Sequence, residues 1–581
     1  MATPSSLPYH EPSITTIIIL SGFLILLNAI NYGLNKLVYC GLVGQVFLGI
    51  AWGTPGTGWL SEATEHSIVQ LGYLGLILVV YEGGLSTDFR SLKANLLLST
   101  AVAITGIALP MAFSFALASM LGASPLQAFS AGAALCSTSL GTTFTVLGTS
   151  GLVTTRMGVV LTSAAMMDDV VGLIMVQVVS NLAGSASNFE PVTVIRPVFV
   201  SLGLTVLFPL MCRFLVRPGT LYLNAVRTKN PGYGLDRLLR LPQTSLIIHT
   251  GCLLGLVIAG TYAGTSGLLS AYVAGATISW WDSEVPHLPT QISQDKEHKR
   301  SIKHTTEPEP TQPTDAGVLT VSPASNQRQL PDESCPNSGT EIYERYYSKA
   351  VSSILSPFFF ASIGFSVPIS QMFSGPIVWK GLVYTILMIL GKLICGIWLL
   401  SFASPLRSLQ RLVKSLSRSR NEVAIVTPGA QCTHRVPRAS NVQALSDTQA
   451  TEPSHSSPER APMAEIQSAD SPTNNASPDP EMPISTYPAC ILGCAMVARG
   501  EIGFLISALA ESTGIFSGQA GAPEKPSDLF LIVTWAITLC TIIGPLCVGL
   551  LVNRVKRLER KSRGGKHNVL GAWGVDQTRI P

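Results

Sequence analysis

Charged residues are scarce in this chain of 581 residues: only 12% are Asp, Glu, Lys or Arg, about half of the roughly 25% found in soluble domains. Long stretches carry no charge at all, which excludes an ordinary soluble protein of several domains. The 11 cysteines show no spacing typical of a disulfide framework or a metal site, and most lie inside apolar runs. The net charge of +4 is too small to indicate a nucleic-acid partner. The composition therefore predicts a polytopic membrane protein with soluble loops.

Nucleotide-binding motifs are also absent from the sequence. No G-x-x-x-x-G-K-[ST] occurs, and no G-x-G-x-x-G follows a predicted strand. We therefore expect no cofactor and no nucleotide partner. If the protein is a transporter, it is expected to run on ion gradients rather than on ATP.

Apolar runs long enough to cross a bilayer recur along the chain. A spanning helix needs about 20 mostly apolar residues, and fewer where it is broken and lined by protein. The 13 candidates are 14–34, 37–53, 67–86, 95–121, 125–148, 157–181, 193–216, 243–263, 266–281, 350–370, 377–403, 487–511 and 528–553. The expected fold class is an all-α polytopic membrane protein with about 13 transmembrane helices.

Two long hydrophilic inserts divide the membrane portion. Both are rich in Ser, Pro, Thr and charge and lack apolar periodicity, which predicts disorder. The expected divisions are an extracytoplasmic N-terminus over 1–13, membrane segments over 14–281 (nine helices), 350–403 (two helices) and 487–553 (the last two), disordered cytoplasmic inserts over 282–349 and 404–486, and a basic cytoplasmic tail over 554–581.

The placement of Lys and Arg predicts the orientation of the spans. With an odd number of spans, the two termini lie on opposite sides of the membrane. Only Arg196, Lys380 and Lys525 fall on one side, whereas the other cations outside the spans fall on the opposite side. The positive-inside rule therefore places the C-terminus and both inserts in the cytoplasm. The sequence leaves open whether the membrane is the plasma membrane or that of a vacuole or endosome.

Six ionisable side chains lie at bilayer depth, where each costs several kcal/mol and marks a functional candidate. They are Glu82, Asp168, Asp169, Lys392, Arg499 and Glu501. For Glu82 and Arg499 taken alone, a structural ion pair or a position near the interface is an equally good interpretation. The pair Asp168 and Asp169 lies in the middle of its span, where no aspartate reaches the interface.

Adjacent residues of a helix project about 100° apart, so one aspartate can face a neighbouring helix while the other faces a water-filled cavity. Such a pair can hold a dehydrated monovalent cation or protons, but not both. Lys392 is the natural partner of one carboxylate, and the arrangement predicts an exchange site. An intramembrane aspartyl protease also needs two membrane aspartates, but on separate helices and with one in a Gly-x-Gly-Asp motif. This chain contains no Gly-Asp dipeptide.

Two of the expected spans look broken. The fifth contains the polar stretch CSTSLGTTFT, and the twelfth contains MVARGEIGF. The two are seven spans apart and so enter the membrane in opposite directions, which predicts an inverted repeat with two broken crossing helices beside the binding site. For the fifth span alone, a Ser/Thr-rich helix that packs closely on its neighbours is a second interpretation.

At these residues the chain resembles the monovalent cation–proton antiporter superfamily, specifically sodium/hydrogen exchangers of the electrogenic Asp-Asp branch. Six segments resemble family motifs in the family's order: GYLGLILVVYEGGLSTDFRSLK, CSTSLGTTFTVL, MMDDVVGLI, SPFFFASIGFSVPI, LGKLICG and ARGEIGFLI. The resemblance covers nearly all of the membrane portion, about 37–281 and 350–553. The inserts and the N-terminus have no counterpart that we recognise.

The resemblance implies a role for the residues around the aspartates. Asp169 would be the principal cation ligand and proton acceptor. Asp168 would be the carboxylate that pairs with Lys392. Thr138 and Ser139 would lie at the crossing beside the site.

The resemblance also implies a mechanism and partners. Arg499 and Glu501 would stabilise the crossing and tune access. A core of spans 4–6 and 11–13 would move against a scaffold of spans 1–3 and 8–10, in a homodimer surrounded by membrane lipid. The protein would be a transporter and not an enzyme. The Asp-Asp pair favours Na⁺ or Li⁺ as the cation exchanged for H⁺, and a K⁺/H⁺ antiporter or K⁺ efflux system on the same fold is the alternative.

Overall fold

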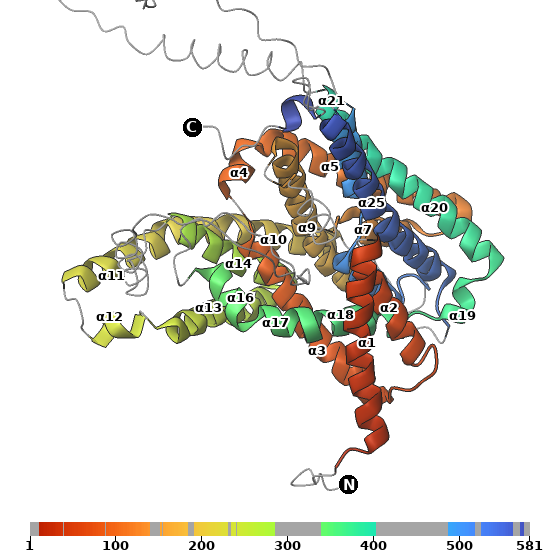
Figure 1. Cartoon of the computed structure of the whole chain (residues 1–581), viewed down its shortest axis with the longest axis horizontal. Helices are drawn as coiled ribbons and strands as arrows, with labels where there is room; N and C mark the ends of the chain where they lie inside the picture. Colours follow the sequence, from red (N-terminus) through yellow and green to blue (C-terminus); the bar gives the residue numbers. More distant parts are fainter. Residues whose placement is uncertain are drawn as a thin grey trace, which may run out of the picture. The chain divides into compact units, whose positions relative to one another are not determined.

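Helices make up the architecture, and the expected all-α fold is confirmed (Figure 1). The computed structural model describes residues 11–38, 40–87, 89–139, 152–153, 155–183, 191–229, 234–239, 241–284, 338–401, 486–517, 525–561 and 570–574. Within these segments, 10 helices are long and apolar enough to cross a membrane.

The helices of the first half of the chain extend to residue 284. They are α1 (Ile14–Val38), α2 (Gly41–Trp52), α3 (Glu62–Leu85), α4 (Phe89–Ala94), α5 (Leu96–Ser114), α6 (Ala116–Leu121), α7 (Pro125–Cys136), α9 (Arg156–Ala183), α10 (Pro191–Met211), the π-helical turn η1 (Cys212–Val216), α11 (Arg217–Lys229), α12 (Gly234–Leu239), α13 (Pro242–Ala263) and α14 (Gly267–Glu284).

The remaining described helices begin at residue 339. They are α16 (Gly339–Tyr346), α17 (Ser348–Ala350), the π-helical turn η2 (Val351–Leu355), α18 (Ser356–Phe365), α19 (Ile369–Met372), α20 (Gly375–Leu393), the 3₁₀ turn η3 (Ile394–Gly396), α21 (Ile397–Ser401), α23 (Tyr487–Val497), α24 (Glu501–Ser512), α25 (Asp528–Lys561) and the 3₁₀ turn η4 (Gly571–Gly574).

Three of the expected spans are not among the 10 long apolar helices. The helices α2 and α7 have 12 residues each, and α14 has 18. The second half of the fifth expected span, beyond Ser139, lies outside the described residues. The count of 13 spans and the inverted repeat therefore stay predictions.

The spanning helices pack in two bundles. In the scaffold bundle, α3 packs against α14 and α18, α18 against α2, α13 against α14, and α1 against α2. In the core bundle, α20 packs against α25, α5 and α23, α5 against α7 and α9, and α24 against α7 and α9. The helix α10 contacts α9 of the core bundle and α14 of the scaffold bundle. Figure 1 shows α20 and α25 running alongside each other.

Glycine pairs allow the closest helix contacts of the scaffold bundle. A Cβ at Gly84 of α3 would collide with the backbone of Tyr272 and Ala276 on α14, and a Cβ at Gly275 would collide with the Tyr81 backbone. Without a driving force from water inside the bilayer, helices associate mainly by such close packing of small residues. These contacts hold α3 and α14 together along one wall of the site described below.

The expected disordered insert over 282–349 is corrected at its C-terminal end, where α16 begins directly after its N-cap residue. The Ser338 hydroxyl accepts a hydrogen bond from the backbone N–H of Glu341 at 3.3 Å. Ile342 and Tyr343 are each 2% exposed, because α16 packs against α3 and α14. A short apolar face inside a polar stretch is enough to dock one helix, although the average composition of the insert hides it.

The helix α25 continues to Lys561 and so includes the first residues of the expected cytoplasmic tail over 554–581, whose cytoplasmic position stays a prediction. The other parts of the expected inserts, 285–337 and 404–485, lie outside the described residues.

Candidate functional site

Two adjacent carboxylates lie in the middle of α9, which runs for 28 residues without interruption. Asp168 is fully buried, whereas Asp169 is half-buried. The Ser137 hydroxyl donates a long hydrogen bond of 3.4 Å to Asp169 Oδ1. Because adjacent helical residues project about 100° apart, the two aspartates have different surroundings.

A buried ion pair joins α9 to α20. Lys392 Nζ lies 2.8 Å from Asp168 Oδ2, and neither side chain is exposed. Nζ also donates to Thr138 Oγ1 at 2.9 Å and to the Cys136 carbonyl at 2.7 Å. The Thr138 hydroxyl in turn donates to Asp168 Oδ2 at 2.8 Å. All three donors of the ammonium are thus used, which a charge buried away from water requires.

Two non-helical segments, one after α7 and one between α23 and α24, meet beside this ion pair and form a crossing. After α7 the chain is extended to Ser139, and between α23 and α24 it is extended from Ala498 to Gly500. The Ser139 N–H donates to the Ala498 carbonyl at 2.9 Å. A Cβ at Gly500 would lie 2.8 Å from both Cβ and Oγ of Ser139, so glycine is needed for this close approach. The twelfth expected span is interrupted at the marked position. In the fifth expected span, α7 ends at Cys136, and the residues from 140 to 151 lie outside the described part of the chain.

The helix ends at the crossing carry partial charges that nearby side chains compensate. The C-terminal end of α7 is partly negative, and its Cys136 and Ser137 carbonyls accept hydrogen bonds from Lys392 and from Arg499 Nη1, both at 2.7 Å. The N-terminal end of α24 is partly positive, and Glu501 lies in its first turn. The signs of these side chains are thus opposite to the partial charges at both helix ends.

Arg499 is fully buried at the crossing. Besides the bond from its side chain to Ser137, its backbone carbonyl accepts a hydrogen bond from the Thr541 hydroxyl of α25 at 3.1 Å. Among the described residues, its Nε and Nη2 atoms have no hydrogen-bond partner. These contacts tie the extended segment after α23 to both α7 and α25.

A cavity of about 540 Å³ lies between the two bundles and reaches Asp169. Ser139 and Glu501 of the core bundle also line it, and Glu82 and Tyr272 line it from the scaffold bundle. None of the described side chains that line it is cationic. Carboxylates in a cavity with low-dielectric walls attract cations and repel anions.

Glu82 lies on α3 and lines the same cavity, and the described contacts do not bring it to the two aspartates. Its side chain is exposed, and its Oε2 atom accepts a hydrogen bond from the Tyr343 hydroxyl of α16 at 3.0 Å. The predicted candidates thus form two groups. One group makes the ion pair and the crossing (Asp168, Lys392, Thr138, Ser139 and Arg499), and the other lines the cavity (Asp169, Glu501 and Glu82, together with Ser139).

Sequence reasoning missed several neutral polar residues that line the cavity from the scaffold bundle. They include Asn31 and Asn35 of α1, Gln45 of α2 and Tyr272 of α14. Gln45 is only 2% exposed, and the Asn35 side chain accepts a hydrogen bond from the Gly41 N–H at 2.7 Å. A single amide in an apolar run is a signal of the same kind as a charge, but a weaker one, because a neutral amide costs less to bury.

Other site chemistries do not fit this arrangement. Within the described residues, no three His, Cys, Asp or Glu side chains are grouped so that they could hold a metal ion. The two aspartates are neighbours on α9, whereas an aspartyl protease needs them to face each other from separate helices.

Comparison with known proteins points to one family. The family described as "Sodium/hydrogen exchanger, transmembrane" matches residues 20–297. The Na(+)/H(+)-K(+) antiporter GerN of Bacillus cereus is 30% identical over 144 residues, which are 25% of this chain and 37% of GerN. The high-affinity Na(+)/H(+) antiporter NhaS3 of Synechocystis is 29% identical over 143 residues, which are 24% of this chain and 31% of NhaS3.

One solved structure has the same fold over most of the chain. The sodium proton antiporter MjNhaP1 from Methanocaldococcus jannaschii aligns with a TM-score of 0.50 and 11% identity, covering 93% of this chain and 99% of that chain. At this identity, the likeness shows the fold alone. The sequence matches to GerN and NhaS3 span less than half the length of those proteins. All three proteins are named as antiporters and not as enzymes. The chain is an integral, multi-pass membrane protein that is similar, over residues 20–297, to the sodium/hydrogen exchanger family of monovalent cation–proton antiporters.

Proposed function

We propose that this protein exchanges a monovalent cation for protons across a membrane by alternating access. The observation that carries the proposal is the pair of adjacent carboxylates on α9, of which one is held in a buried ion pair and the other faces a cavity. A carboxylate in that position binds a cation or a proton on the same oxygens, so the two ions compete. Competition for one site is the basis of exchange.

In this proposal Asp169 binds the exchanged ion and Asp168 assists it. Within the described residues, Asp168 Oδ1 has no hydrogen-bond partner, while Oδ2 accepts from both Lys392 and Thr138. The Oδ1 atom is therefore the oxygen that can turn to a cation held by Asp169. Binding of that cation would weaken the ion pair to Lys392, because the cation competes for the same carboxylate.

Alternating access requires the site to move as a unit. The ion pair, the crossing and Asp169 all belong to the core bundle, whereas the opposite wall of the cavity belongs to the scaffold bundle. A movement of the core bundle against the scaffold bundle would therefore carry the intact site from one side of the membrane to the other. Arg499 and Glu501 would hold the crossing together during this movement.

The chemistry of the site and the names of two relatives support a choice of transported cation. Two carboxylates with one lysine favour Na⁺ or Li⁺, and NhaS3 is named as a Na(+)/H(+) antiporter. The name of GerN includes both Na⁺ and K⁺, which supports K⁺ exchange as the second candidate. We further propose that the protein is a homodimer with its C-terminus and both inserts in the cytoplasm, in the plasma membrane or an endomembrane.

Reconstitution into liposomes that enclose a pH-sensitive dye tests the proposal. With an imposed pH gradient, external Na⁺, Li⁺ and K⁺ are added in turn, and the cation that dissipates the gradient is the substrate. Asp169→Asn should abolish this response, because an amide neither accepts the proton nor neutralises the cation. Glu284→Gln, at an exposed position at the end of α14, is the matched control and should keep it.

Two results would contradict the proposal. One is a wild-type protein, correctly inserted, in which none of the three cations moves protons. The other is near-normal exchange by Asp169→Asn, which would place the site elsewhere.

A further inference from the structure

An apolar groove of about 910 Å³ runs along α1 and α2 and shares no lining residue with the ion cavity. Ile30, Leu34 and Leu37 of α1 line it together with Phe47 and Leu48 of α2. Leu37 is 75% exposed and Phe47 is 45% exposed, so the groove is open on its outer side. In a bilayer this face meets hydrocarbon and not water.

Two glycines shape the groove. At Gly44, a Cβ would collide with the side chains of Ile30 and Leu34, so α1 and α2 pack tightly at this point. At Gly33, a Cβ would meet nothing within 4 Å, so the space beside α1 is open there. The two helices are therefore tightly packed at Gly44, and the middle of the groove, beside Gly33, is not filled by side chains.

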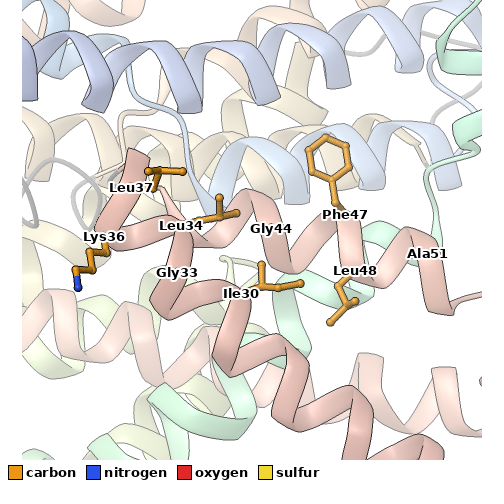
Figure 2. Close-up of a pocket in the computed structure, with 9 residues that line it drawn as sticks. All are labelled: Ile30, Gly33, Leu34, Lys36, Leu37, Gly44, Phe47, Leu48 and Ala51. Atoms are coloured by element: carbon orange, nitrogen blue, oxygen red, sulfur yellow. The ribbon is translucent and has the colours of Figure 1, made fainter.

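One end of the groove carries a single charge. Figure 2 shows Lys36 at one end of the row of lining residues and Ala51 at the other. Lys36 lies in the last turn of α1, its side chain is exposed, and no described residue forms an ion pair with it. The other lining residues are all apolar or glycine. This pattern, a long apolar channel with a cation at its end, matches an acyl chain that carries an anionic headgroup.

A second copy of the chain fits this pattern less well. In a two-fold interface each copy presents the same patch to the other. Among the described residues, no acidic side chain lines the groove, so the same patch on a partner would offer none to neutralise Lys36. A lipid phosphate supplies that charge, and the orientation predicted from the sequence puts this end of α1 in the cytoplasmic leaflet, where anionic lipids concentrate.

We propose that the groove between α1 and α2 is a binding site for an anionic phospholipid, with an acyl chain beside Gly33 and the headgroup at Lys36. The proposal does not depend on the proposed cation exchange. The same segment of α1 carries Asn31 and Asn35, which line the ion cavity. A bound lipid would thus contact the helix that separates the groove from the cavity.

Native mass spectrometry of the full chain tests the site. The purified protein is offered equal amounts of phosphatidylserine and phosphatidylcholine, and the lipid that it retains is counted. The wild type should retain phosphatidylserine in preference. Gly33→Leu should lose it, because leucine fills the empty middle of the groove, and Lys36→Gln should retain about fivefold less, as expected for one cation at a membrane surface.

Two control variants make the same substitutions elsewhere. Gly255→Leu adds a leucine at an exposed position of α13 where a Cβ also meets nothing within 4 Å, and Lys93→Gln removes an exposed lysine of α4. Both should retain phosphatidylserine as the wild type does. If the controls lose as much phosphatidylserine as the groove variants, the lipid binds non-specifically over the membrane surface of the protein, and the proposal is overturned.

Three further results would also overturn the proposal. Gly33→Leu with undiminished phosphatidylserine would mean that the lipid binds elsewhere. Equal retention of both lipids by the wild type would mean that the headgroup is not recognised. A dimer mass that Gly33→Leu converts to a monomer mass, with lipid binding unchanged, would make a second copy of the chain the occupant.

Discussion

Replacing Lys392 by alanine tests the buried ion pair. In the wild type the ammonium makes three contacts of 2.7 to 2.9 Å, to Cys136, Thr138 and Asp168. Its removal leaves the fully buried carboxylate of Asp168 with the Thr138 hydroxyl as its only described hydrogen-bond donor. Removing one partner of a buried ion pair costs about 3–5 kcal/mol, because the remaining charge is not compensated. We expect Lys392→Ala to lower the free energy of unfolding by that amount.

Thermal unfolding of the purified full chain measures the effect. Lys380→Ala on the same helix is the control: Lys380 is half-buried and forms no ion pair with a described residue, so its loss should change the stability by no more than about 0.5 kcal/mol. The double variant Lys392→Ala with Asp168→Asn removes both charges. It should be more stable than Lys392→Ala alone, because no charge is left buried without a partner.

Two outcomes would refute this reasoning. If Lys392→Ala unfolds at the same temperature as Lys380→Ala, breaking the ion pair does not lower the stability of the protein. If the double variant is as unstable as Lys392→Ala, the cost comes from the lost packing of the lysine stem and not from a stranded charge.

Three further changes have defined expectations. Thr138→Val removes the hydroxyl that bridges the ion pair, so it should cost about 1–3 kcal/mol in thermal unfolding and slow exchange in liposomes; an unchanged melting temperature would contradict the bridge. Tyr343→Phe removes the donor to Glu82 and should lower stability by about 1 kcal/mol in the same assay, whereas no change would mean that water replaces this bond. Deletion of 425–480, which lies outside the described residues, should leave exchange intact, and complete loss in correctly inserted protein would show that the insert takes part in transport.

The charges of the site could be predicted because the bilayer makes each of them expensive. A lysine buried in the membrane needs an anionic partner, and the carboxylates in the middle of α9 were the natural partners of Lys392. The sequence pattern alone left open which aspartate that is, because adjacent residues point in different directions. The choice of Asp168 depends on how α20 packs against its neighbours, and only the resemblance and then the structure supply it.

The two helix breaks could also be predicted, because polar and glycine residues interrupt apolar runs at Ser137 and at Gly500. The cavity, in contrast, could not be predicted from the sequence. Its scaffold wall combines Gln45, Glu82 and Tyr272 from α2, α3 and α14. These residues are far apart in the sequence, and only long-range packing of the helices brings them together. Local patterns indicate which residues are unusual, but not which of them share a cavity.

The crossing of the two broken helices leads to a last prediction, Gly500→Ala. The backbone at Gly500 is extended, with φ −146° and ψ −151°, so alanine meets no conformational barrier from a positive φ. The cost comes from space: the new Cβ would lie 2.8 Å from Cβ and Oγ of Ser139, closer than real contacts allow. The segments must move apart, which weakens the bond from Ser139 N–H to the Ala498 carbonyl. Overpacking of this kind costs about 1–3 kcal/mol.

Thermal unfolding and liposome exchange should both fall in Gly500→Ala. Gly203→Ala on α10, where a Cβ meets nothing within 4 Å, is the matched control and should be as stable as the wild type or slightly more so. Adding Ser139→Gly to Gly500→Ala removes both atoms that the new Cβ meets, so the double variant should recover part of the lost stability. If Gly500→Ala behaves like Gly203→Ala, or if Ser139→Gly fails to restore it, the close approach of these two segments is not what holds the crossing together.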